Sequence, residues 1–146
     1  MTNLLKRLVM AAFILIPLHA SAEEPATEAT VYKDPDCGCC QGYVDHLRAN
    51  GFRVETVETS DLMSIKQKHG IPDDMAACHT MLIGGYVVEG HVPLTTLRKL
   101  LGERPRIKGI ALPGMPIGTP GMEGPKEEPF TIYEISDGEP RVFNVE

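Results

Sequence analysis

Three cysteines within four residues are the most unusual chemical feature of this sequence. They occupy the segment Cys37-Gly38-Cys39-Cys40, which follows the turn residues Asp34-Pro35-Asp36. Cysteine acts as a nucleophile and binds metals in its thiolate form, and the start of a helix lowers the pKa of a thiol. Cys37 and Cys40 have the C-x-x-C spacing of redox dithiols, whereas Cys39 is a third thiol that a dithiol enzyme does not need. The segment therefore indicates a soft metal site, a redox site, or both.

A second cysteine segment, Cys78-His79, directly precedes an expected strand at 81–83. In the layout argued below, the start of this strand lies beside the N-terminus of the first helix. We therefore expect Cys78 to face the three-cysteine segment. His79 has two interpretations. It is a further ligand or proton carrier, or it is an ordinary polar residue that points away from Cys78, as neighbours on a strand do. His91 either caps a helix at the surface or reaches the same site.

Two methionines lie in a glycine- and proline-rich stretch, within the near-repeat Pro-Gly-Met at 113–115 and 120–122. Thioether ligands favour soft Cu(I), so Met115 and Met122 are candidate ligands. The alternative is that both side chains only fill gaps beneath the loop, as methionine often does. By their spacing, Met63, Met75 and Met81 are interpreted as core or edge residues.

The set of soft donors narrows the choice of metal. Four cysteines suit Zn(II) and iron–sulfur clusters as well as copper, but one C-x-C-C segment with a distant cysteine is no common zinc-ribbon or ferredoxin pattern. The export argued below also disfavours an iron–sulfur cluster, which must be assembled before export. The donors therefore favour Cu(I), and four bridging thiolates could hold more than one copper ion.

Length and composition exclude several classes of protein. The chain has 146 residues, the length of one domain. Acidic side chains outnumber basic ones 20 to 14, so the chain lacks the basic excess of nucleic-acid-binding proteins. Hydrophobic residues make up 42% of the chain, too many for a disordered acidic protein, and the absence of Trp predicts an aliphatic core.

The N-terminal residues have the features of a secretory signal peptide. Lys6 and Arg7 precede an uncharged run from Leu8 to Leu18, which is too short to span a bilayer core of about 30 Å. The sequence Ala20-Ser21-Ala22 then supplies a cleavage site. We expect a signal peptide at 1–22, a single domain at 23–146, a periplasmic location, and no membrane attachment after cleavage.

Hydrophobic periodicity predicts an alternation of strands and helices that must position these side chains. The expected strands are 29–33, 52–57, 81–83 and 86–88, and the expected helices are 39–50, 62–69 and 93–101. Gly84-Gly85 would join two of the strands in a hairpin. The order β-α-β-α-β-β-α is that of an α/β, thioredoxin-like fold, with a central mixed sheet flanked by helices.

The C-terminal part of the sequence adds to this core. A loop rich in Gly, Pro and Met covers 112–125, and a hairpin of strands at 130–135 and 141–145 turns through Asp137-Gly138. We found no internal repeat and no second domain.

Four sequence motifs in this order resemble the CopG-type periplasmic copper-resistance proteins, a family long known only as a domain of unknown function. The motifs are Asp36-Cys37-Gly38-Cys39-Cys40, Ala77-Cys78-His79-Thr80, the run from Gly85 to Pro93, and the run from Pro113 to Glu123. The resemblance covers 31–123. It implies a thioredoxin-like fold, copper bound by cysteines, and a role in copper handling that includes conversion between Cu(I) and Cu(II).

Carried over position by position, the resemblance implies copper thiolates at Cys37, Cys39, Cys40 and Cys78. It adds further candidate ligands, which are Met115, Met122, His79 and His91. Copper ions, and periplasmic proteins that donate or accept copper, would be the partners.

Three hypotheses remain open from the sequence. The first is a periplasmic protein of copper resistance that binds Cu(I) through the cysteine cluster. The second is a metal-free thiol–disulfide oxidoreductase, in which Cys37 and Cys40 are the catalytic pair. The third is a binding module stapled by disulfides, without chemistry of its own. The sequence leaves open whether the protein is an enzyme.

Overall fold

The computed structural model describes residues 27–136 and 138–146, and the predicted signal peptide lies outside them. The described chain forms one mixed sheet in the order β2-β1-β3-β4-β5-β6-β7. The strands are β1 (Glu28–Lys33), β2 (Arg53–Glu58), β3 (His79–Ile83), β4 (Tyr86–Glu89), β5 (Gly109–Ala111), β6 (Thr131–Glu134) and β7 (Arg141–Val145). The helices are α1 (Gly38–Ala49), α2 (Leu62–Lys68), the 3-10 helix η1 (Asp73–Met75) and α3 (Leu94–Glu103).

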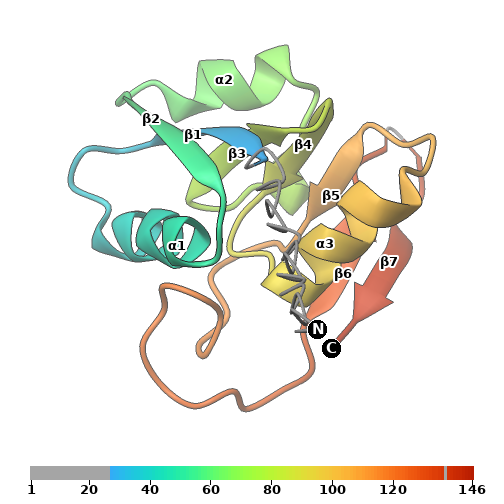
Figure 1. Ribbon diagram of the computed structural model, residues 1–146. Coiled ribbons are helices and arrows are strands. Elements are labelled where there is room, and N and C mark those ends of the chain that lie inside the picture. Colours follow the sequence, from blue (N-terminus) through green and yellow to red (C-terminus); the bar gives the residue numbers. More distant parts are fainter. Residues whose placement is uncertain (1–26, 137) are drawn as a thin grey trace, which may run out of the picture.

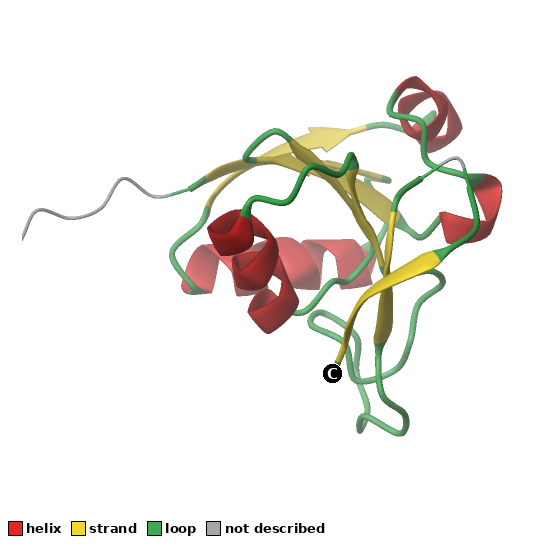
Figure 2. Cartoon of the chain, turned by 90° about the vertical axis from the view of Figure 1, so that its right-hand side faces the viewer, coloured by secondary structure: helices red, strands yellow, loops and turns green. Residues whose placement is uncertain are grey.

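Helices cover both faces of the sheet. Helices α1 and α3 lie on one side and α2 lies on the other (Figure 1). Figure 2 shows the twisted strands curving over the two helices of the first side. Strand β1 is parallel to β2 and antiparallel to β3, and β3 is antiparallel to β4. No helix among the described residues is long and apolar enough to cross a bilayer.

The predicted architecture of a mixed α/β sheet flanked by helices is confirmed. Gly84 and Gly85 form the predicted hairpin turn, each with a positive φ, and Ile83 pairs with Tyr86 across it. The C-terminal strands β6 and β7 are also antiparallel neighbours, although Asp137 in the turn between them lies outside the described residues. The short strand β5 was not predicted, because three residues carry too little periodicity to be recognised.

The predicted end of the last helix was wrong. Helix α3 continues through Gly102 and ends at Glu103, where Arg104 takes a left-handed conformation with φ 48° and its N–H bonds to the carbonyl of Leu100. Glycine is unfavourable inside a helix but is tolerated there, and Gly102 lies within the last turn of α3. The stop signal is thus a non-glycine residue in the conformation that usually selects glycine.

The larger hydrophobic core lies between the sheet and helices α1 and α3. Its fully buried members include Val31, Tyr43, Leu47 and Met81. A smaller core, which contains Met75, covers the opposite face of the sheet. The interpretation of Met75 and Met81 as core residues is confirmed, but that of Met63 is wrong.

Met63 is 51% exposed on helix α2. A helix as short as α2 presents only a narrow stripe of side chains to the sheet, and Met63 lies outside that stripe.

Met81 and Met63 form a matched pair for testing this core. Met81→Ala removes a fully buried side chain and should lower the free energy of unfolding by about 2 to 5 kcal/mol. Met63→Ala should change it by less than about 0.5 kcal/mol, because that side chain is largely exposed. Urea denaturation of both variants measures the difference. Equal losses in the two variants would contradict the assigned core.

Candidate metal site

The three-cysteine segment forms the start of helix α1. Cys37 is the N-cap residue, and its Sγ accepts the N–H of Cys40 at 3.4 Å. The preceding turn is fixed by Asp34, whose carbonyl accepts the N–H of Cys37 at 3.1 Å and whose carboxylate accepts the N–H of Asp36 at 2.9 Å. The thiols of this segment therefore lie at the positive end of the helix, where the thiolate form is favoured.

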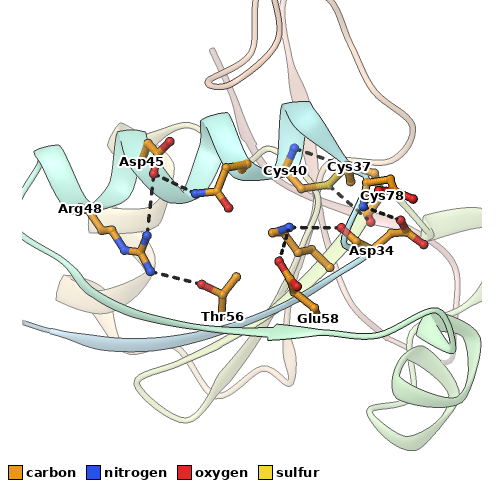
Figure 3. A network of polar contacts seen from close by, with 11 residues as sticks. Asp34, Cys37, Cys40, Asp45, Arg48, Thr56, Glu58 and Cys78 are labelled. Atoms are coloured by element: carbon orange, nitrogen blue, oxygen red, sulfur yellow. Dashed lines mark hydrogen bonds and ion pairs between the residues drawn. A yellow bond between two sulfur atoms is a disulfide. The ribbon is translucent and has the colours of Figure 1, made fainter.

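Cys37 and Cys40 are joined by a disulfide, while Cys39 and Cys78 are free thiols. Figure 3 shows the disulfide at the start of α1, beside Cys78. Cys39 stays close to the pair, because its Sγ lies 3.5 Å from the Sγ of Cys37. The site thus contains a disulfide with C-x-x-C spacing and a separate third sulfur in the same turn.

Sheet pairing brings Cys78 to this turn. The register of β1 and β3 places Lys33 opposite His79, so the residues after β1 and the residue before β3 meet at one edge of the sheet. The Sγ of Cys40 lies 3.7 Å from the carbonyl oxygen of Cys78. The Sγ atoms of all four cysteines lie within 4.8 Å of one another, and they come from Cys37, Cys39, Cys40 and Cys78.

Two buried histidines extend the site on the side of Cys78. The Sγ of Cys78 lies 2.9 Å from Nε2 of His91 and 3.4 Å from Nδ1 of His79, and both rings are fully buried. Nδ1 of His91 donates to the carbonyl of Pro120 at 2.7 Å, which leaves Nε2 as an acceptor or ligand atom. A second group of possible ligand atoms within 4.8 Å consists of Cys40, Cys78, His79 and His91.

The surface or capping alternative for His91 is wrong. His91 follows β4 directly and is covered by the loop that carries Pro120. The alternation of a strand does not separate His79 from Cys78, because Cys78 precedes β3, and Nδ1 of His79 lies 3.4 Å from the Sγ of Cys78. Among the described residues, Nε2 of His79 has no hydrogen-bond partner although it is buried.

Tyr43 on helix α1 encloses the histidines, a role that sequence reasoning missed. Its ring centroid lies 4.7 Å from that of His79 and 5.4 Å from that of His91, and its hydroxyl donates to the carbonyl of Val92 at 2.8 Å. In the sequence this residue is one of the apolar positions of a helix, so only the fold reveals its contact with the site.

Burial sets the protonation states of the site. Burial raises the pKa of Cys78 to about 12, with a further contribution from the charge of Cys39. Burial also lowers the pKa of His79 and of His91, and each histidine is neutral near pH 7 as a result. The site therefore offers sulfur atoms and neutral imidazole nitrogens, which are donors suited to soft or borderline cations such as Cu(I) and Zn(II).

The covering loop, which spans 112–125 and carries Met115 and Met122, approaches the site both at the start of α1 and beside Cys78. A Cβ atom at Gly121 would lie 2.5 Å from the backbone N of Tyr43 and 2.6 Å from the carbonyl O of Cys39, so only glycine permits this approach to α1. Met122, the next residue, is half-buried. Gly114 forms a bridge with Ala77 beside Cys78, and Met115 follows it with an exposed fraction of 54%.

The comparisons with known proteins agree with these features. A family model described as a protein of unknown function, DUF411, matches residues 75–122. Two solved structures entitled copper resistance protein CopG, Form 2 and Form 1, are each 38% identical and cover 84% of this chain. The chain in turn covers 99% and 98% of those chains, with TM-scores of 0.76 and 0.75. No curated protein matches. The chain therefore belongs to the family of the copper resistance protein CopG.

Proposed function

We propose that this protein is exported to the periplasm and binds Cu(I) there as part of copper resistance. The observation that carries the proposal is the convergence of four cysteine sulfurs within 4.8 Å of one another. Cu(I) is satisfied by two or three sulfur ligands, and thiolates can bridge metal ions. Four thiolates this close together suit one copper ion or a small copper cluster.

Reduction of the disulfide is the step that would make all four ligands available. It converts Cys37 and Cys40 into two thiols next to the free thiols of Cys39 and Cys78. His79 and His91 would complete the set with neutral nitrogens on the side of Cys78. Met115 and Met122 are proposed as weaker thioether ligands on the covering loop.

The same pair of cysteines supports a redox role. When two thiolates form the disulfide, they release two electrons, and these suffice to reduce two Cu(II) ions to two Cu(I) ions. A reduced partner that returns two electrons to the disulfide would complete the cycle. We therefore propose that Cys37 and Cys40 convert Cu(II) to Cu(I), with periplasmic copper donors or acceptors as partners.

A second candidate function is a metal-free thiol–disulfide oxidoreductase. The disulfide between Cys37 and Cys40 at the start of α1 favours it, because dithiol enzymes use this placement. This function needs neither Cys39 nor Cys78. The third sulfur in the turn and the two buried histidines beside Cys78 favour the copper site instead.

Anaerobic loading with Cu(I) separates the two candidates. The reduced protein without its first 22 residues should take up Cu(I) in the presence of Zn(II), and Cys39→Ser should lower the copper bound per chain. Met122→Leu and Met115→Leu should weaken binding, whereas the exposed Met63→Leu on α2 serves as the unchanged control. Copper per chain and free thiols are measured before and after loading.

Unchanged copper stoichiometry in Cys39→Ser would refute the cluster. Turnover of a model disulfide that persists in both Cys39→Ser and Cys78→Ser, without uptake of Cu(I), would establish the oxidoreductase in its place.

Copper affinity should rise with pH because of Cys78. Its pKa of about 12 keeps the free thiol protonated between about pH 6 and pH 8, so an ion that binds the thiolate must expel a proton. That proton contributes about a tenfold gain in affinity per pH unit. The histidines add no proton release near pH 7, since their pKa values are lowered.

Competition titrations of Cu(I) over this pH range measure the slope. Cys78→Ser should reduce the number of protons released by one, and an identical slope in this variant would show that Cys78 does not bind the ion.

A further inference from the structure

A buried carboxylate lies directly behind the segment that carries Cys78 and His79. Glu89 at the end of β4 is fully buried, and its Oε1 accepts the N–H of Ala77 at 2.6 Å. Its Oε2 accepts the hydroxyl of Thr80 at 2.7 Å. Ala77 and Thr80 are the residues on either side of Cys78-His79. A single side chain therefore ties both ends of this dipeptide.

Lys66 of helix α2 holds this carboxylate in place. Its Nζ forms an ion pair with Oε1 of Glu89 and donates to the hydroxyl of Thr80 at 3.1 Å. Lys66 is 5% exposed, so both charges are withdrawn from water. A buried ion pair contributes little net stability compared with apolar side chains of similar size, because desolvation offsets the attraction. Lys66 balances the buried charge of the carboxylate that makes the two hydrogen bonds, so a neutral side chain that keeps those bonds does not need the lysine.

The carboxylate and the metal site occupy opposite faces of the sheet. Side chains alternate along β3 and β4, so Thr80 and Glu89 face α2 while His79 faces Tyr43 on α1. The backbone of the dipeptide is also held from the neighbouring strand, because the N–H of Gly90 donates to the carbonyl of His79 at 3.0 Å. Glu89 therefore fixes Cys78 mainly through hydrogen bonds to the residues that flank the dipeptide, and its charge adds only the smallest of the contributions that raise the pKa of Cys78.

We propose that Glu89, held by Lys66, is a positioning residue that fixes Cys78 against the three-cysteine turn. The consequence for copper rests on the proposed function, but the placement of the thiol does not. With the disulfide between Cys37 and Cys40 formed, the free thiols of Cys39 and Cys78 lie within 4.8 Å of each other. Phenylarsine oxide, which must bind two neighbouring thiols, reports this placement without copper.

Two double variants isolate the effect of the hydrogen bonds. Lys66→Met/Glu89→Gln removes both charges but keeps a carbonyl oxygen for Ala77 and a polar group for Thr80. Lys66→Met/Glu89→Leu removes the charges and the hydrogen bonds together. This variant should still fold, because an apolar pair can replace a buried ion pair without loss of stability. In the oxidised protein, the Gln variant should capture phenylarsine oxide as the unsubstituted protein does. The Leu variant should capture it about 10- to 100-fold more weakly.

Thermal unfolding of both double variants provides the control for fold. Equal capture by the Gln and Leu variants, or no capture by the unsubstituted protein, would overturn the proposal. If the Leu variant does not fold, Thr80→Val against Thr80→Ser gives the independent test, because only serine retains the hydroxyl that binds Glu89. Weaker capture in Thr80→Val alone supports the proposal, and equal capture contradicts it.

Copper binding then separates this proposal from the proposed function. The Leu variant should bind Cu(I) more weakly than the Gln variant, and this difference should vanish when Cys78→Ser is added to both. A difference that persists without Cys78 would show that Glu89 acts elsewhere and would overturn the proposal. Capture of phenylarsine oxide that follows the predicted order, in a protein that takes up no Cu(I), would refute the copper site and leave the positioning role intact.

Discussion

The antiparallel pairing of β1 with β3 is the constraint on which the site depends. It places Lys33, the last residue of β1, opposite His79, the first residue of β3. One strand leaves the sheet here toward the three-cysteine turn, and the other enters it immediately after Cys78. A shift of this register by one residue would turn the side chain of His79 to the other face of the sheet and away from Tyr43. The sulfur atoms of Cys40 and Cys78, 38 residues apart, therefore meet because of the backbone pairing of β1 with β3, not because of their own attraction.

Burial gives the site a character that exposed ligands would lack. Burial favours the uncharged form of the donors on the side of Cys78. It lowers the pKa of both histidines and raises the pKa of the Cys78 thiol. Cys39 and Cys37, in contrast, lie at the start of a helix and are only partly buried. A cation that reaches the interior must compensate for desolvation by forming several bonds at once. Soft ions, which form strong bonds to sulfur, meet this requirement better than hard ones.

The sequence predicted those parts of the structure that depend on local signals. The glycine pair at 84–85 specified a hairpin, and the order of strands and helices specified the mixed sheet. The four cysteines were identified because thiols are rare and their spacing was unusual. The burial of His91 could not be predicted, because it depends on a loop almost thirty residues further along the chain. Glu89 lies in the run from Gly85 to Pro93, but only the fold shows that its carboxylate reaches Ala77, just before β3, and Thr80 on β3.

The contact between Pro120 and His91 has a consequence for engineering. The imidazole is oriented by a carbonyl on the glycine- and proline-rich loop, the cysteine turn lies at the start of α1, and Cys78 precedes β3. No short peptide cut from this chain would carry all three stretches. Transplanting the site into another scaffold would require that scaffold to supply a helix start, a strand start and a covering loop at matching distances. Chimaeras that exchange the covering loop between relatives would for the same reason reorient an imidazole that the exchanged segment does not contain.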